Sequence, residues 1–315
     1  MAFVVDGAEW CFDGWSEDAI IKAIEDTLDR IWIARDRQES VWIGDDLQTR
    51  RVLGDFDLWS LCSTIAPITL PAELVQELSA WLGSARRYLD DECEWPDGLT
   101  ETTHIQIIPD TTAENVDVAW AHHHVRAGRP MACLGLTRSG LHETISSAGR
   151  AQVHWVRDDA THRAFWRSAI DIEGDSEGTL KRIAPHAFPD LHFHHELWRG
   201  LKRLAGGYLA VRSQIRQYLT VLDDYGRWVF TFPPPALSPD EAIEAEANAR
   251  PTNQVIEKRF RGLDLDMAPE KPNVYANREC RAAREITVKD RLLYCEWHGK
   301  LEPHQNRLHV HAPVK

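Results

Sequence analysis

The chain has no long apolar run, and this absence excludes a helix that crosses a membrane. No stretch of the sequence reaches the roughly 18 consecutive apolar residues that such a helix needs. The opening residues, MAFVVDGAEW, also lack the basic start and extended apolar segment of a secretory signal. We therefore expect a cytoplasmic protein that has no membrane partner.

Cysteine pairs at metal-binding or redox spacing are missing as well. The six cysteines of the 315-residue chain are scattered, and no CxxC occurs. In a chain of this length, such cysteines are typical of reduced, buried thiols in a cytoplasmic protein. The sequence thus predicts neither a disulfide framework nor a zinc site built on cysteine pairs, and it predicts no cofactor on these grounds.

Three signatures of nucleotide-binding and hydrolytic enzymes are absent. The sequence has no GxxxxGK[ST], whose glycine-rich turn and lysine hold phosphates, and no GxGxxG, which opens dinucleotide-binding domains. It also has no GxSxG, the strand-to-helix turn that presents the serine nucleophile of α/β-hydrolases. These absences argue against nucleotide hydrolysis, Rossmann-type redox chemistry and α/β-hydrolase activity.

The sequence has fewer basic than acidic residues. Lys and Arg number 36 against 49 Asp and Glu, which gives a formal net charge of −13. A protein that holds duplex DNA needs clustered positive charge, so duplex DNA is not an expected partner. Residues 236–315 are charge-balanced, and the rest of the chain carries the whole negative excess. We expect this acidic part to bind a protein partner.

Apolar spacing predicts a mixture of helices and strands. Apolar residues recur at helical spacing over residues 17–35, behind the capping hydroxyl of Ser16, and a second long helix is predicted over 208–230. Short strands are predicted at 104–108, 131–136 and 151–156. The expected fold class is therefore α+β.

A run of prolines marks the expected domain boundary, because a helix cannot continue through residues 232–235, FPPP. Residues 1–235 are predicted to form an acidic, mainly helical regulatory or partner-binding domain with short strands. Residues 236–315 are predicted to form a small α+β domain. It should contain a helix at 238–248 and a loop at 264–277, and it should end in an antiparallel β-hairpin.

Residues 290–314 carry the most informative pattern, DRLLYCEWHGKLEPHQNRLHVHAPV. Polar and apolar side chains alternate over 292–298 and again over 307–311, with a turn-forming segment between the two runs. Lys300 is expected opposite Arg307 in a hairpin. His298 then faces His309, and Glu296 faces His311. One face should carry Tyr294, Glu296, His298, Lys300, Arg307, His309 and His311. The other should pack on the core through Leu293, Cys295, Trp297, Leu308 and Val310.

Three interpretations of this polar face stay open. The first is metal-free RNA cleavage, in which the 2′-hydroxyl of RNA is an internal nucleophile and needs a base, an acid and cations on the phosphate. Glu296 or His298 would be the general base, and His309 or His311 the general acid. The expected substrate-binding residues are Tyr294, Lys300, Arg307, Arg281 and Arg284. Compact microbial ribonucleases and ribosome-dependent toxin nucleases place similar residue types on a small antiparallel sheet, which is an analogy of chemistry alone.

The second interpretation is a metal site. Imidazoles on alternate strand positions converge well enough for zinc or another transition metal, and His298, His309 and His311 would be the ligands. The third is a solvated face, since alternating polar residues occur on any half-buried strand. A similar choice applies to three arginines that recur every three residues. On a helix, Arg278, Arg281 and Arg284 form either a phosphate-binding ridge or a solvated face.

The leading hypothesis is a metal-independent endoribonuclease-like effector of the kind that acts in bacterial toxin and antiviral defence systems, with RNA as its substrate. The alternative is a non-catalytic protein-interaction or regulatory module, in which the C-terminal histidines are structural or bind a metal. RNA cleavage that survives EDTA would separate the two hypotheses.

Overall fold

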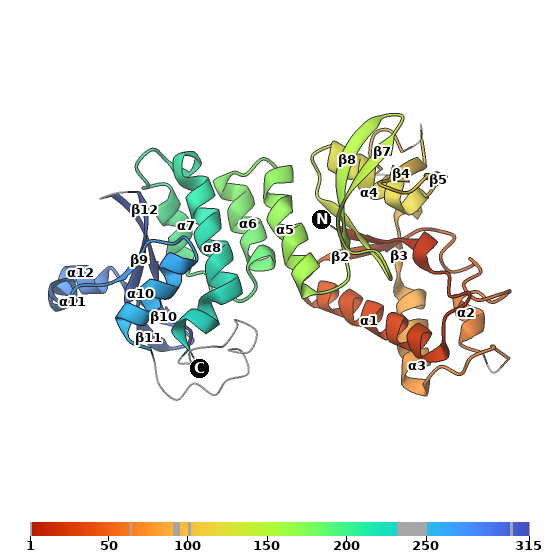
Figure 1. Cartoon of the computed structure of the whole chain (residues 1–315), viewed down its shortest axis with the longest axis horizontal. Coiled ribbons are helices and arrows are strands. Elements are labelled where there is room, and N and C mark those ends of the chain that lie inside the picture. The colour runs from red at the N-terminus through yellow and green to blue at the C-terminus, as the bar shows by residue number, and fades with distance from the viewer. Residues whose placement is uncertain are drawn as a thin grey trace. The chain divides into compact units, whose positions relative to one another are not determined.

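A computed structural model of the chain describes residues 2–63, 65–90, 95–99, 102–231, 251–302 and 305–314. The chain divides into two compact units, Met1–Gly174 (unit 1) and Asp175–Lys315 (unit 2). Both units combine helices and strands, so the protein belongs to the α+β class. Figure 1 labels most of the elements and colours them from red at the N-terminus to blue at the C-terminus.

Unit 1 is built on an eight-stranded mixed sheet with the strand order β3-β2-β1-β6-β8-β7-β4-β5. Its first five strands are parallel, and the last three extend the sheet antiparallel. The strands are β1 (Ala2–Val5), β2 (Ser40–Ile43), β3 (Arg86–Arg87), β4 (His104–Ile107), β5 (Thr112–Glu114), β6 (Met131–Leu134), β7 (Gly140–Ser146) and β8 (Gly149–Val156). The strands predicted near residues 104, 131 and 151 are thus confirmed.

The helices of unit 1 cover both faces of this sheet. They are α1 (Glu17–Asp36), α2 (Leu58–Leu61), α3 (Ala72–Ser84), α4 (Val116–Arg126) and α5 (Asp159–Ile172), with short 3-10 turns η1 (Gly7–Glu9) and η2 (Tyr88–Asp90). Successive side chains of β1 point to opposite faces. Phe3 packs on Phe165 of α5 with ring centroids 5.2 Å apart, whereas Val4 joins the buried cluster around Trp120 of α4. Because β1 is buried on both sides, it is apolar throughout and lacks the alternation that reveals a half-buried strand.

Unit 2 combines helices with two small antiparallel sheets. Its helices are α6 (Glu177–Ala187), α7 (His195–Leu201), α8 (Tyr208–Phe230), α10 (Asn253–Gly262), α11 (Pro272–Ala276) and α12 (Arg278–Ala282). Its strands are β9 (Met267–Pro269), β10 (Glu285–Val288), β11 (Arg291–Tyr294), β12 (Trp297–Glu302) and β13 (Gln305–Val310). The sheets have the orders β13-β12-β9 and β10-β11. The segment 264–277, predicted as a loop, therefore contains a strand and a helix.

The boundary between the units lies well before the predicted proline boundary at residue 235. Helix α8 belongs to unit 2 and lies against β12 (Figure 1). Phe230 of α8 packs against Phe260 of α10 and Trp297 of β12, with ring centroids 5.6 Å and 5.8 Å away. Helix α8 ends at Phe230, and unit 2 continues beyond it to the C-terminal strands. The prolines lie outside the described residues, as does the helix predicted at 238–248.

Candidate active site

Strand β12, the central strand of the three-stranded sheet in unit 2, brings two histidines together. Its register with β13 places His298 opposite His309 and Lys300 opposite Arg307, which confirms the predicted pairing. The two imidazole rings have centroids 6.1 Å apart. His298 is only 5% exposed, so a merely solvated strand face does not describe this part of the sheet.

A carboxylate that the hairpin pattern does not contain lies between the two histidines. Glu270 follows β9, which pairs with the other edge of β12, and its side chain is 4% exposed. Its Oε1 atom lies 3.3 Å from Nδ1 of His298 and 3.3 Å from Nδ1 of His309. The same oxygen accepts a 2.8 Å hydrogen bond from Nε of Arg284. One carboxylate oxygen thus joins three basic side chains from separate segments of unit 2.

The charge of Glu270 decides which nitrogen of each imidazole carries the proton. Neither Nδ1 contact has the geometry of a hydrogen bond, so the contacts are electrostatic, and a negative oxygen favours a protonated Nδ1 facing it. The unprotonated nitrogen is then Nε2. In His298, a guanidinium nitrogen of Arg307 lies 3.3 Å from Nε2 and donates to it. In His309, whose side chain is 31% exposed, Nε2 stays available as a base.

Burial and nearby charges set the protonation states of the site. Burial and then the charge of Arg284 lower the pKa of His309 to about 4, although the charge of Glu270 opposes the shift. Burial also lowers the pKa of His298 against the opposing effect of Glu270. For Glu270 itself, burial opposes ionisation, but the hydrogen bond and charge of Arg284 outweigh it and hold the pKa below its ordinary value. At neutral pH, a carboxylate therefore faces two neutral imidazoles.

The predicted substrate-binding residues divide between the site and its surroundings. Tyr294 ends β11 with its hydroxyl shielded from solvent and without a hydrogen-bond partner among the described residues. Burial and then the charge of Glu270 raise the pKa of Tyr294. Lys300 lies at the edge, where Nζ is 3.0 Å from both carboxylate oxygens of Asp266.

The three arginines do not form the single ridge that their spacing predicts. Helix α12 ends at Ala282, so Arg284 lies beyond it and turns inward to Glu270. Arg281 is on the helix, and its Nε lies 3.2 Å from a carboxylate oxygen of Glu285. Only Arg284 of this set belongs to the histidine site.

One expectation about the hairpin is wrong. Residues 292–298 do not form one strand, because β11 ends at Tyr294 and pairs with β10 before the chain enters β12. Glu296 lies between the two strands, and the β12–β13 ladder begins only at Trp297 opposite Val310, so the predicted Glu296–His311 pair is not part of it. The backbone carbonyl of Glu296 instead accepts the N–H of Glu270 at 2.8 Å. The carboxylate that contacts both histidines is that of Glu270.

The alternative metal site is not formed by this arrangement. Over the described ranges of the chain, no three His, Cys, Asp or Glu side chains are arranged to hold a metal ion. His298 and His309 turn Nδ1 towards Glu270, whereas Nδ1 of His311 donates to the carbonyl oxygen of Ala312. The arginines beside the two imidazoles would also repel a cation.

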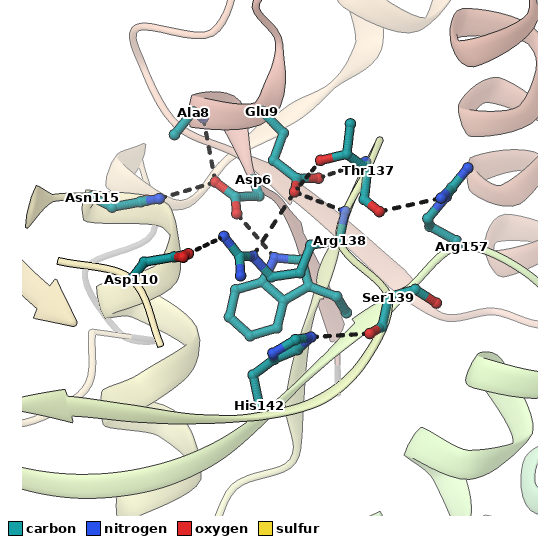
Figure 2. A network of polar contacts seen from close by, with 11 residues as sticks. Asp6, Ala8, Glu9, Asp110, Asn115, Thr137, Arg138, Ser139, His142 and Arg157 are labelled. Atoms are coloured by element: carbon teal, nitrogen blue, oxygen red, sulfur yellow. Dashed lines mark hydrogen bonds and ion pairs between the residues drawn. The ribbon is translucent and has the colours of Figure 1, made fainter. Parts of the chain in front are cut away.

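Unit 1 has a second group of polar residues, at the carboxyl ends of its parallel strands (Figure 2). The strand order reverses between β1 and β6, and open α/β sheets bind ligands beyond such a reversal. Asp6 directly follows β1 and accepts a 2.9 Å hydrogen bond from the indole N–H of Trp155. Glu9 accepts hydrogen bonds from the backbone N–H groups of Thr137 and Arg138, which follow β6. The sequence analysis predicted none of these contacts.

The carboxylates of this network accept hydrogen bonds from donor groups of the protein itself. Asp117, which is buried, accepts hydrogen bonds from the N–H of Gly7 and the hydroxyl of Tyr88, both at 2.9 Å. Burial, and then the charge of Asp6, raises the pKa of Asp117 to about 7. We interpret the network as structural, because its hydrogen bonds connect the segments that follow the strands of unit 1. We therefore place the candidate active site in unit 2.

Comparisons of the chain with protein-family models, with curated proteins and with solved structures found no match. Among the helices of the described residues, none combines the length and the apolar character needed to cross a membrane. The geometry of Glu270, the two histidines and the neighbouring arginines is therefore the basis for a functional proposal.

Proposed function

We propose that unit 2 is a metal-independent endoribonuclease in which His309 is the general base. The observation that carries this proposal is the Oε1 atom of Glu270, which contacts Nδ1 of both histidines while Arg284 and Arg307 lie beside them. A carboxylate that orients an imidazole, and a cation that neutralises a phosphate, are the groups that attack by an RNA 2′-hydroxyl requires.

In the proposed reaction, Nε2 of His309 takes the proton of the 2′-hydroxyl as the 2′-oxygen forms a bond to phosphorus. The bond between phosphorus and the 5′-oxygen breaks, and the leaving oxygen takes a proton from water. The imidazolium then returns its proton to the hydroxide so formed. The products are a 2′,3′-cyclic phosphate and a 5′-hydroxyl, and no metal takes part.

The neighbouring residues stabilise the charges that develop. Arg307 is exposed and contacts the phosphate, where its guanidinium neutralises the negative charge of the transition state. Glu270 stabilises the imidazolium that His309 becomes. A bound phosphate raises the pKa of His309 from about 4 towards neutrality, because an anion favours the protonated ring. Such an activity suits a toxin or antiviral defence effector, with the acidic N-terminal part binding a protein partner.

The test is cleavage of a mixed-sequence RNA pool by the purified protein, with and without EDTA. Cleavage should survive EDTA and yield 2′,3′-cyclic phosphate ends. His309→Ala should reduce the rate by about 10²–10⁴-fold, which is the usual contribution of a general base. Glu270→Gln should also reduce it, because the imidazole loses its charged partner.

The matched control is His104→Ala, which removes an exposed strand histidine of unit 1 and should leave the rate unchanged. Melting temperatures of all variants separate loss of chemistry from loss of fold. Cleavage that EDTA abolishes, or full activity in His309→Ala, would show that the proposed mechanism is wrong.

A further inference from the structure

Unit 2 contains a cavity of about 940 Å³ that the proposed reaction does not use. Its walls come from α6, from the segment before α7, and from α7 with the residues that follow it. Its volume lies within the roughly 300–1,000 Å³ of small-molecule sites. Two aromatic side chains, Phe193 and Trp198, line the cavity with ring centroids 5.4 Å apart. They give it an apolar surface on which a flat ring can stack.

The charged lining of this cavity is mainly cationic, in contrast to the net charge of −13 of the whole chain. Its charged residues are Glu177, Lys181, Arg199, Lys202 and Arg203. Arg199 is paired with Glu196. The other cations, Lys181, Lys202 and Arg203, are exposed and form no ion pair with any residue in the described part of the chain. Their charges therefore attract an anionic ligand.

Hydrogen bonds connect one wall of the cavity to the hairpin of the candidate active site. Arg203 is followed two residues later by Ala205, whose N–H donates to Oδ1 of Asn306 at 2.9 Å. The side-chain amide of Asn306 donates back to the carbonyl oxygen of Ala205, also at 2.9 Å. Asn306 directly precedes Arg307 in β13. The cavity wall and the proposed phosphate-binding arginine thus lie on segments that are bonded to each other.

We propose that this cavity binds single-stranded RNA next to the scissile phosphate. A base stacks on Trp198 and Phe193, and backbone phosphates contact Lys181, Lys202 and Arg203. Aromatic stacking combined with cationic contacts is how proteins hold single strands without reading their sequence. The inference rests on the proposed endoribonuclease function and adds the site that holds the strand beside the cleaved bond.

Binding is tested apart from cleavage, with a short fluorescent RNA whose 2′-O-methyl groups prevent attack on the phosphate. Trp198→Ala should raise the Kd about tenfold through the loss of base stacking. Trp198→Phe keeps a stacking ring and should retain most of the affinity. The double variant Lys202→Gln/Arg203→Gln should lower the slope of log Kd against log salt by about 1.4, because each phosphate contact with a single strand contributes about 0.7.

The charge-matched control is Lys258→Gln/Arg261→Gln, which removes two exposed cations of α10 outside the cavity and should leave both Kd and slope unchanged. Unchanged values in the cavity variants would overturn the proposal. So would competition by a mononucleotide at concentrations near the Kd of the RNA, because the occupant would then be a free nucleotide.

The failures of the two proposals are distinguishable. If the cavity variants weaken RNA binding but the protein cleaves no RNA, the endoribonuclease proposal is refuted and the RNA-binding role of the cavity stands. If the protein cleaves RNA but no cavity variant changes its RNA affinity, the RNA-binding role of the cavity is refuted and the endoribonuclease proposal stands.

Discussion

At the scale of single residues, the proposed chemistry of unit 2 depends on Glu270. One of its oxygens contacts Arg284, His298 and His309, and the side chain is almost fully buried. Arg284 keeps it ionised. The carboxylate faces Nδ1 of His309, so that Nε2, the proposed base, lies on the other side of the imidazole ring. The proposed activity therefore requires Glu270, although this residue does not itself contact the reacting atoms.

The low pKa of His309 predicts the pH dependence of catalysis. A general base acts only when it is unprotonated, and kcat/KM reports the ionisation of the free enzyme. Since the pKa is lowered to about 4, kcat/KM should rise with pH through about 4 and be level by about pH 6. The acid limb of kcat should lie at higher pH, because bound phosphate raises the pKa. Initial rates on labelled RNA measure both limbs, and a kcat/KM limb at the ordinary histidine value of 6.5 would contradict the assignment of His309.

The sequence predicts both histidines of this site but not its carboxylate. The sequence predicts His298 and His309 because polar and apolar residues alternate over residues 292–298 and 307–311. Glu270 follows a strand of three residues that ends in Pro269, which is too short to show a period. The segment forms a strand because it pairs with the edge of β12. That pairing is a property of the folded unit and leaves no local signal.

At the scale of elements, strand β12 depends on a glycine that lets a helix approach it. A Cβ atom built on Gly299 would lie 2.3 Å from Cε1 of Tyr218 on α8. The hydroxyl of Tyr218 donates to the carbonyl oxygens of Asp266 and Lys300 at 2.9 Å and 3.1 Å. The tyrosine therefore cannot move away without breaking its contacts to β12 and to the residue that precedes β9.

Gly299→Ala should destabilise the protein by about 1–3 kcal/mol, the usual cost of forcing an extra carbon into a packed core. Urea unfolding measures the change. Gly262→Ala is the matched control, because no heavy atom lies within 4 Å of a Cβ built at that glycine. Equal stability of the two variants would show that α8 is not held against β12 as described.

The hairpin shows how a correct pattern can hide a break between elements. The register of His298 with His309 follows from alternation and is confirmed. The same alternation runs without interruption from Leu293 through Cys295 to Trp297, although β11 ends and β12 begins within that segment. Cys295 and Trp297 are both buried, so the apolar positions keep their parity across the break. Periodicity indicates which side chains are buried, but it does not indicate which strands pair with each other.

At the scale of the whole molecule, each unit has an aromatic core of its own. Phe3, Phe165 and Trp166 pack together in unit 1, and Phe230, Phe260 and Trp297 in unit 2. Units with separate cores are expected to unfold separately. The proline run at residues 232–235 suggested a different division because it is a local signal, whereas the unit boundary follows from the packing of α8 in three dimensions.

Calorimetry of the intact chain should therefore show two thermal transitions. Gly299→Ala should lower the transition of unit 2. Trp155→Phe should lower that of unit 1 by removing the indole N–H that donates to buried Asp6, a loss of about 1–3 kcal/mol. If both substitutions shifted the same transition, the two units would unfold as one.

The central place of β1 in its sheet also has a consequence for synthesis. This strand pairs on one side with β2 and on the other with β6, more than a hundred residues further along the chain. At about 5–20 residues per second, the ribosome needs on the order of ten seconds to deliver β6 after β1. During that interval the apolar AFVV strand has one unpaired edge, and α5, which covers Phe3, has not yet been made. A nascent chain stalled before Leu134 would therefore be a target for chaperones, however stable the finished protein is.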